Sequence, residues 1–163
     1  MFRAPLLALA LSAAAAVSAS AKPASDLLVK SSTRSVKDSI EVLAQAVEAA
    51  GAKVIARVDH AAGAKVVGAE MKPSEVLIFG NPKLGTPLML ANPRAGLDLP
   101  MKVLAYEDAA GKVWLVTTRP ATLKARYNIK GRDDVIAAMT TALDKLTGAA
   151  AGTPAAPAAS ARK

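Results

Sequence analysis

The chain lacks cysteine, has a single histidine (His60) and contains few aromatic residues, which make up 3% of its 163 residues. Without cysteine it has no disulfides, no thiolate metal ligands, no iron–sulfur ligation and no thiol nucleophile. One histidine excludes His-rich metal sites, and the serine-nucleophile pattern G-x-S-x-G is absent as well. These absences exclude several classes of enzyme before any motif is considered.

Residues 1–21 have the pattern of a cleavable secretory signal. Arg3 provides a basic start, residues 6–17 are apolar and uncharged, and small residues precede Lys22 at the expected cleavage site. The apolar stretch is too short to cross a bilayer comfortably. We therefore expect a periplasmic or secreted protein with no membrane span after signal cleavage.

The other end of the chain also differs from an ordinary domain. Residues 148–163 are half alanine, are interrupted by Pro154 and Pro157, and contain no large apolar side chain to bury. This composition predicts a disordered tail. Residues 22–147 then form one domain, a size that can bury a real core.

The formal net charge of the whole chain is +8, from 21 basic and 13 acidic side chains. Three of the basic residues lie in the two ends, so the expected domain carries a smaller excess. Its basic residues are scattered, and the longest grouping contains only Lys124, Arg126, Lys130 and Arg132. We expect no nucleic-acid partner, because neither a basic stripe nor interleaved aromatic residues are present.

Residues 35–50 give the clearest helical pattern. Their apolar side chains recur every three or four residues and form one continuous stripe. Ser35 is placed to cap this helix with Asp38 as its capping-box partner, and Gly51 is placed to end it. An amphipathic helix of this kind needs a surface to cover, and a sheet is the natural one.

Five segments are typical of strands: residues 26–30, 53–58, 75–79, 101–107 and 113–118. Within the second of these, alternation predicts Val54, Ala56 and Val58 on one face, with Lys53 and Arg57 on the other. The last two strands are expected to form a hairpin.

Further helices are expected after the third strand and near the end of the chain. Thr86 and Pro87 suit the cap and first position of a short helix, a turn is expected over residues 121–127, and residues 133–146 form a last helix that ends at Gly148. The resulting order is β-α-β-β-α-β-β-α. It predicts a two-layer α+β domain with a mainly antiparallel sheet packed against helices.

Several short motifs in the middle of the chain occur in a recognisable order. They are Asp59-His60, the run from Glu75 to Pro82, Gly85 to Met89, Leu97 to Pro100, Glu107-Asp108 with Gly111, and Pro120 with Leu123. In these motifs the chain resembles the family catalogued as domain of unknown function 302, over roughly residues 26–130. The resemblance implies a small α+β domain with an antiparallel sheet, frequently exported in bacteria. It implies no activity and no cofactor.

Asp59 and His60 form one candidate site. A carboxylate beside an imidazole is the arrangement of a general base or a metal ligand. Neighbouring residues on a strand point to opposite faces, however, so contact between the two requires a turn at this point. The alternative is a capping or structural role.

The segment from Gly80 to Pro87 is a second candidate. It joins a strand to a helix start, where free backbone N–H groups, with Lys83 nearby, suit a carboxylate or phosphate. Asn81, Gly85 and Thr86 belong to this candidate ligand site. The spacing of a nucleotide-binding loop is missing, and a tight structural turn is the alternative.

Asp98 lies between two leucines near Arg94. One possible role is a carboxylate that is paired with a cation and has a lowered pKa, or a catalytic acid. The other is a clamp that accepts hydrogen bonds within the loop. A sharper hypothesis brings Asp59, His60, Asp98 and Tyr106 together in one pocket.

Three functions remain open on the sequence. The first is a binding domain for a small, for instance anionic, ligand or for a protein partner. The second is an enzyme that uses His60 with Asp59 or Asp98 for acid–base or single-metal chemistry. The third is a non-catalytic structural protein of the cell envelope. The sequence names no cofactor, and both a monomer and a homodimer are compatible with it.

Overall fold

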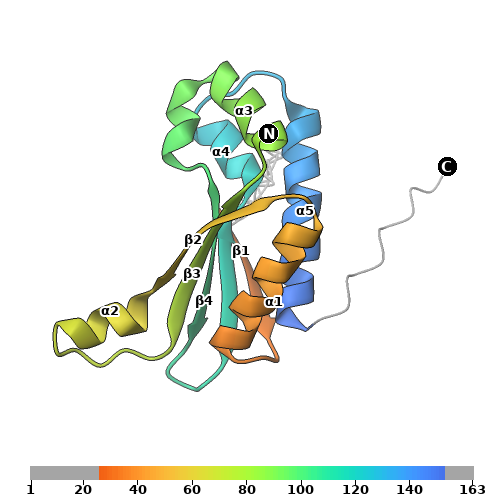
Figure 1. Cartoon of the computed structure of the whole chain (residues 1–163). Helices are drawn as coiled ribbons and strands as arrows, with labels where there is room; N and C mark the ends of the chain where they lie inside the picture. The colour runs from red at the N-terminus through yellow and green to blue at the C-terminus, as the bar shows by residue number, and fades with distance from the viewer. Residues whose placement is uncertain (1–25, 153–163) are drawn as a thin grey trace, which may run out of the picture.

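The computed structural model describes residues 26–152, which form a five-stranded sheet with two long helices side by side on one face (Figure 1). The elements in chain order are β1 (Leu27–Ser32), α1 (Val36–Ala49), β2 (Lys53–Asp59), α2 (His60–Val66), β3 (Ser74–Gly80), α3 (Pro82–Ala91), the 3-10 turn η1 (Pro93–Leu97), β4 (Met101–Glu107), β5 (Val113–Thr118), α4 (Pro120–Arg126) and α5 (Asp133–Ala151). The sheet order is β1-β5-β4-β3-β2, and every neighbouring pair is antiparallel. The expected α+β fold with an antiparallel sheet is confirmed.

Helix α1 forms as its sequence predicts. The Ser35 hydroxyl accepts a hydrogen bond from the Asp38 N–H at 3.1 Å and donates one to the Asp38 carboxylate at 2.7 Å. Gly51 follows the helix with a φ of +73°. The apolar stripe, including Ile40 and Leu43, is buried against the sheet and against α5.

Strand β2 departs from simple alternation because it contains a β-bulge at Ile55. Val54 pairs with Phe79 on the helix-covered face, whereas Ala56 pairs with Ile78 on the other face. The prediction that Val54, Ala56 and Val58 share one face is therefore wrong. The extra residue of a bulge reverses the direction of every side chain beyond it.

Two helices differ from the sequence prediction. Helix α2 was not expected, and it begins directly after β2. Helix α3 begins at Pro82 rather than near Thr86, and Pro87 lies inside it. The Asn81 side chain accepts from the Lys83 N–H at 3.0 Å, so Asn81 and Pro82 supply the cap and first position earlier than Thr86 and Pro87.

Helix α5 continues past Gly148 to Ala151, so the predicted helix end and tail start are wrong. Gly148, Ala150 and Ala151 are buried, and the Thr33 N–H donates to the Ala151 carbonyl at 3.0 Å. The Arg34 guanidinium donates to the carbonyls of residues 149 and 150 at 3.0 and 3.2 Å. Small side chains let the last turn approach this segment closely. The predicted signal (1–21) and the rest of the tail (153–163) lie outside the described residues.

The packing of β3 gives a direct test of the core. Leu77 is fully buried, whereas Leu97 on η1 is 81% exposed. Leu77→Ala removes buried methyl groups and leaves a cavity, so we expect it to lower the free energy of unfolding by about 2–5 kcal/mol. Leu97→Ala serves as the matched control and should have little effect. Equal losses in chemical denaturation of the two variants would contradict this placement of the core.

Candidate functional site

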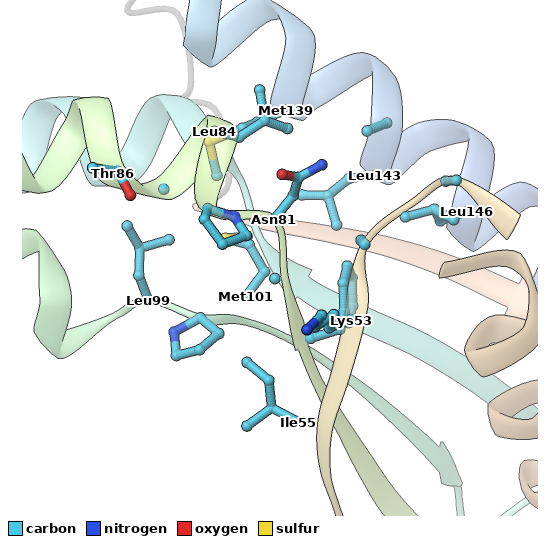
Figure 2. A pocket seen from close by; sticks show the side chains of 18 of the residues that line it. Lys53, Ile55, Asn81, Leu84, Thr86, Leu99, Met101, Met139, Leu143 and Leu146 are labelled. Atoms are coloured by element: carbon cyan, nitrogen blue, oxygen red, sulfur yellow. The ribbon is translucent and has the colours of Figure 1, made fainter. Parts of the chain in front are cut away.

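A cavity of about 440 Å³ lies where one end of the sheet meets α3 and α5 (Figure 2). Its lining comes from β2, β3, α3, the Leu99–Met101 segment and α5. These segments are far apart in the sequence and meet only in the folded chain. A volume of this size is typical of pockets that bind small molecules.

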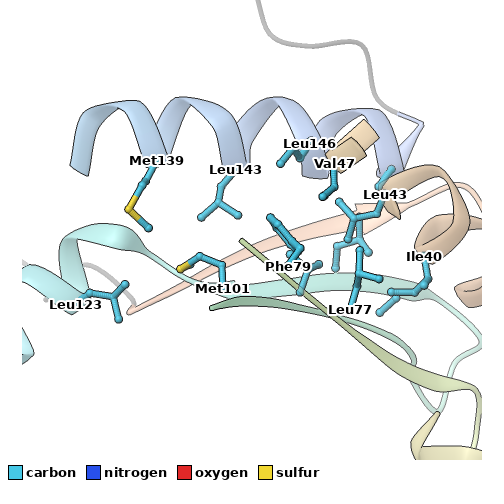
Figure 3. Close-up of a cluster of buried hydrophobic side chains, with 14 of the residues drawn as sticks. Ile40, Leu43, Val47, Leu77, Phe79, Met101, Leu123, Met139, Leu143 and Leu146 are labelled. Atoms are coloured by element: carbon cyan, nitrogen blue, oxygen red, sulfur yellow. The ribbon is translucent and has the colours of Figure 1, made fainter. Parts of the chain in front are cut away.

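The floor of the pocket is continuous with the hydrophobic core (Figure 3). Phe79 and Met101 from the sheet, with Met139, Leu143 and Leu146 from α5, are buried and line it. Two of these five side chains are methionines, which adapt to ligands of irregular shape. The floor therefore offers an apolar and adjustable surface.

The rim of the pocket exposes large apolar side chains. Ile55, the unpaired residue of the β2 bulge, is 57% exposed, and Met89 of α3 is 36% exposed. The bulge thus takes Ile55 out of the strand pairing at the point where β2 borders the pocket. Exposed apolar groups around an apolar cavity mark a place where a ligand gains contact area.

Three polar side chains also line the pocket: Lys53, Asn81 and Thr86. The Oδ1 atom of Asn81 is occupied by its cap to Lys83, but its Nδ2 atom has no partner among the described residues. Lys53 is exposed and is the only charged residue in the lining. The pocket therefore combines an apolar interior with one positive charge and two neutral hydrogen-bonding groups.

The segment 80–87 was expected to hold an anion through free backbone N–H groups. In the structure Asn81 accepts from all of these groups: its side chain bonds Lys83 N–H, and its carbonyl bonds the N–H groups of Leu84 and Gly85. These donors are not free, and the bonding is that of the structural turn named as the alternative. Asn81, Gly85 and Thr86 nevertheless line the pocket, whereas Lys83 is exposed outside the lining.

Asp59 and His60 lie at the opposite end of β2 from the pocket rim. The Asp59 carboxylate accepts from the Ala62 N–H at 2.8 Å and so caps α2. His60, the first residue of α2, is exposed. The pair thus has the geometry of the capping alternative, and neither residue lines the pocket.

Asp98 bonds α4 rather than the neighbouring Arg94. Its Oδ2 atom accepts from the Arg126 guanidinium at 2.5 Å and from the Tyr127 hydroxyl at 2.8 Å. Partial burial raises the pKa of Asp98, but the two hydrogen bonds and the charge of Arg126 outweigh it, and the net pKa is lowered. The bond to this carboxylate in turn raises the pKa of Tyr127. Asp98 therefore matches the paired carboxylate with a lowered pKa, with Arg126 rather than Arg94 as its partner, and the pair clamps the segment after η1 to α4.

The hypothesis that Asp59, His60, Asp98 and Tyr106 converge is wrong. Asp59 pairs with Glu75 and Tyr106 with Ser74 at the start of β3, whereas Asp98 follows η1 near the other end of the sheet. Seven strand residues separate the two ends by about 20 Å. Tyr106 also points to the face opposite Asp59. Among residues 26–152 no three His, Asp or Glu side chains gather in a way that would hold a metal ion.

Sequence reasoning missed most of the pocket, because its lining is apolar. In a single sequence, the α5 side chains cannot be distinguished from ordinary core residues, nor Ile55 from an ordinary strand residue. One signal was available for Ile55, a large apolar residue between Lys53 and Arg57 on a strand face expected to be polar. Such a break in alternation is what one extra residue in a strand produces.

Comparison with known proteins places the chain in a family. Residues 28–146 match the family described as Domain of unknown function DUF302. The chain belongs to this family. The match includes most of α5, which the motif resemblance did not reach.

Relatives in Brucella carry a functional name. A protein named Fluoride-specific ion channel FluC 1 from Brucella suis biovar 1 is 45% identical over 129 residues, covering 78% of this chain and 51% of the relative. One of the same name from Brucella abortus biovar 1 is also 45% identical over 129 residues, covering 78% of this chain and 48% of the relative. The chain thus spans about half the length of the relatives it matches. Within residues 26–152, no helix has the length and hydropathy needed to cross a membrane.

A solved structure shares the fold. The crystal structure of an uncharacterized conserved DUF302 protein from Bacillus stearothermophilus has a TM-score of 0.69 and 17% sequence identity, and the match covers 77% of this chain and 98% of that one. At this identity the likeness shows the fold alone.

The clamp at Asp98 predicts a pH-dependent loss of stability. Arg126→Gln should lower the unfolding midpoint at pH 7 by a few degrees, whereas Arg94→Gln should not. The folded pKa of Asp98 is lowered, so its bonds stabilise the protein above the unfolded pKa of about 3.9 and are lost as the pH falls through the folded pKa. The difference between wild type and Arg126→Gln should therefore shrink in acid. Thermal unfolding at pH 7 and in acid measures it; a difference that is the same at both would contradict the clamp.

Proposed function

We propose that this chain binds a small amphipathic molecule whose apolar body occupies the pocket and whose anionic head lies near Lys53. The observation that carries the proposal is an apolar cavity of about 440 Å³ with one cationic side chain in its lining. A binding role for a small ligand was among the functions left open by the sequence. The pocket supports this role and adds an apolar body to the ligand.

The apolar lining sets the main part of the expected affinity. Transfer of a ligand's methylene group from water into such a lining contributes about 0.8 kcal/mol. Burial of an unpaired ion in the same place is costly, because few donors replace its hydration shell. The pocket therefore suits a carbon chain or ring system and does not suit a bare inorganic anion.

The polar lining sets the expected head group. The Lys53 ammonium is exposed, so a carboxylate bonded to it keeps access to water while the apolar part is buried. Asn81 Nδ2 and the Thr86 hydroxyl offer further hydrogen bonds along the lining. A carboxylic acid with an apolar body is the simplest molecule that matches all three groups.

The names of the Brucella relatives suggest fluoride as a ligand, and the pocket gives a reason against it. Fluoride is small and strongly hydrated, whereas the lining is mostly carbon. We therefore propose no fluoride binding by this pocket and use fluoride as the negative control.

Straight-chain carboxylic acids of increasing length test the proposal. In thermal-shift or calorimetric titrations of the full chain, we expect affinity to rise about fourfold per added methylene until the pocket is full. An acid present at a hundred times its dissociation constant should stabilise the fold by about 2.7 kcal/mol. Sodium fluoride and inorganic phosphate should give no comparable shift. Affinity that does not depend on chain length would contradict an apolar site.

Two pairs of variants locate the binding. Ala142 lines the pocket, and Ala138 lies one turn earlier on α5, exposed and outside the lining. Ala142→Phe should abolish binding, while Ala138→Phe should leave it unchanged. Lys53→Met should weaken acids but not the corresponding alcohols, and Lys83→Met should weaken neither. Loss of binding in both members of either pair would place the ligand elsewhere.

The enzyme hypothesis gains no support from this geometry. His60 is exposed near the far end of β2, and neither Asp59 nor Asp98 lies in the lining of the pocket. Asp59 and His60 lie at the opposite end of the sheet from Asp98. The pocket likewise favours a binding role over a purely structural role in the envelope, because a scaffold needs no cavity.

We further propose that the chain is exported through cleavage of residues 1–21. The support is the sequence pattern alone, with a basic start, an apolar stretch and small residues before Lys22. N-terminal sequencing of the protein from fractionated bacteria should give a chain that begins at or near Lys22 outside the cytoplasm. An uncleaved chain in the cytoplasm would contradict export.

A further inference from the structure

One face of the sheet is covered by α1 and α5, and no described helix lies over the other (Figure 1). The pairing register shows which side chains this second face carries, because directly opposite residues of antiparallel strands share a face. We call it the open face. It is formed by the alternate strand residues that do not point toward α1 and α5.

A continuous apolar row crosses the open face from edge to edge. Val29 lies opposite Val116, Val116 opposite Leu104, Leu104 opposite Val76, and Val76 opposite Val58. Val29 and Val58, at the two ends of the row, are 47% and 41% exposed. One apolar side chain from each of the five strands therefore contributes to this cross-sheet row.

The rest of the open face is also poor in charge. On either side of the row it carries Leu27, Ile78, Trp114 and Tyr106, and the described strands place only two charged residues on it, Lys102 and, at the end of β2, Lys53. A sheet face that meets water normally alternates to polar residues. This face instead resembles the centre of an interface, where charged residues are depleted and aromatic residues enriched.

The row is also symmetric about its centre. β4 is the middle strand of the sheet, and Leu104 is the middle residue of both β4 and the row, with two valines on each side. Consider a two-fold axis that lies in the plane of the interface, passes over Leu104 and runs either along the row or along β4. Rotation about this axis places the row of one copy on the row of the other. Such a self-complementary patch is what a two-fold dimer requires.

We propose that a second copy of this chain covers the open face, so that two sheets stack with one cross-sheet row on the other in a two-fold homodimer. Five strands of six or seven residues present a face of about 24 by 20 Å. Two such faces bury about 1,000 Å² in total, which is at the lower limit for a specific interface. The dimer is therefore weak, and its population depends on concentration.

Sedimentation velocity of the full chain over a range of micromolar to millimolar concentrations tests the proposal. The wild type should shift from monomer to dimer as concentration rises. Leu104→Lys places two ammonium groups against each other near the two-fold axis, so it should stay monomeric over the whole range. Leu97→Lys is the control: Leu97 is 81% exposed on η1, outside the five strands that form the open face, and this variant should dimerise as the wild type does.

A second variant distinguishes loss of the dimer from loss of the fold. Val29→Lys changes a half-exposed residue on the edge strand β1 and should also weaken the dimer, with an unchanged circular dichroism spectrum. A wild type that is monomeric at every concentration would overturn the proposal. So would a dimer that survives both Leu104→Lys and Val29→Lys.

Cross-linking places the contact directly, because the chain has no native cysteine. Stacked sheets lie about 10 Å apart, which is too far for a direct disulfide, so a short bismaleimide is the appropriate reagent. Leu104→Cys should give a covalent dimer, and Leu97→Cys should not. The reverse result, or a monomer that instead co-floats with lipid vesicles, would assign the open face to another occupant and overturn the proposal.

Discussion

The packing of α1 and α5 against the same face of the sheet determines where the other features of the molecule lie. α1 buries its apolar stripe over β2, β3 and β4, while α5 covers β1 and β5 and packs along α1. Together the two helices complete a layer on one side only. The opposite face stays uncovered, and at one end of the sheet α5, α3 and the bulged edge of β2 enclose the pocket.

Elements whose sequences carry their own signals were predictable. α1 has a stripe and a cap within its own residues, and the β4–β5 hairpin has a local turn in which Asp108 accepts from the N–H groups of Ala110 and Lys112. The bulge in β2 was not predictable, because register depends on the partner strand as well as on the strand itself. The end of α5 was missed for a similar reason: whether alanine and glycine are buried depends on Thr33 and Arg34, more than a hundred residues earlier.

The candidate site shows the same contrast between features set by local sequence and features set by distant parts of the chain. Asp59, Asn81 and Asp98 drew attention because carboxylates and amides perform catalysis and ligand binding. The same groups also cap helices and clamp loops, and in this chain Asp59 and Asp98 serve such structural roles. The pocket consists mainly of side chains that a single sequence cannot distinguish from core. The pocket can be recognised only in the folded chain, because segments that are distant in the sequence form it together.

The hydrogen bond from Thr33 to Ala151 has a consequence for the order of events as the chain folds. It joins residues 118 positions apart, and β1 pairs only with β5, so the first strand has no partner in the sheet until most of the chain exists. Contacts of such long range slow folding, because loop closure precedes the gain from packing. In a newly made chain β1 and the segment at Thr33 thus lack their partners until synthesis is nearly complete. Such a delay suits a polypeptide that crosses a membrane before it folds, which is the fate we propose for this one.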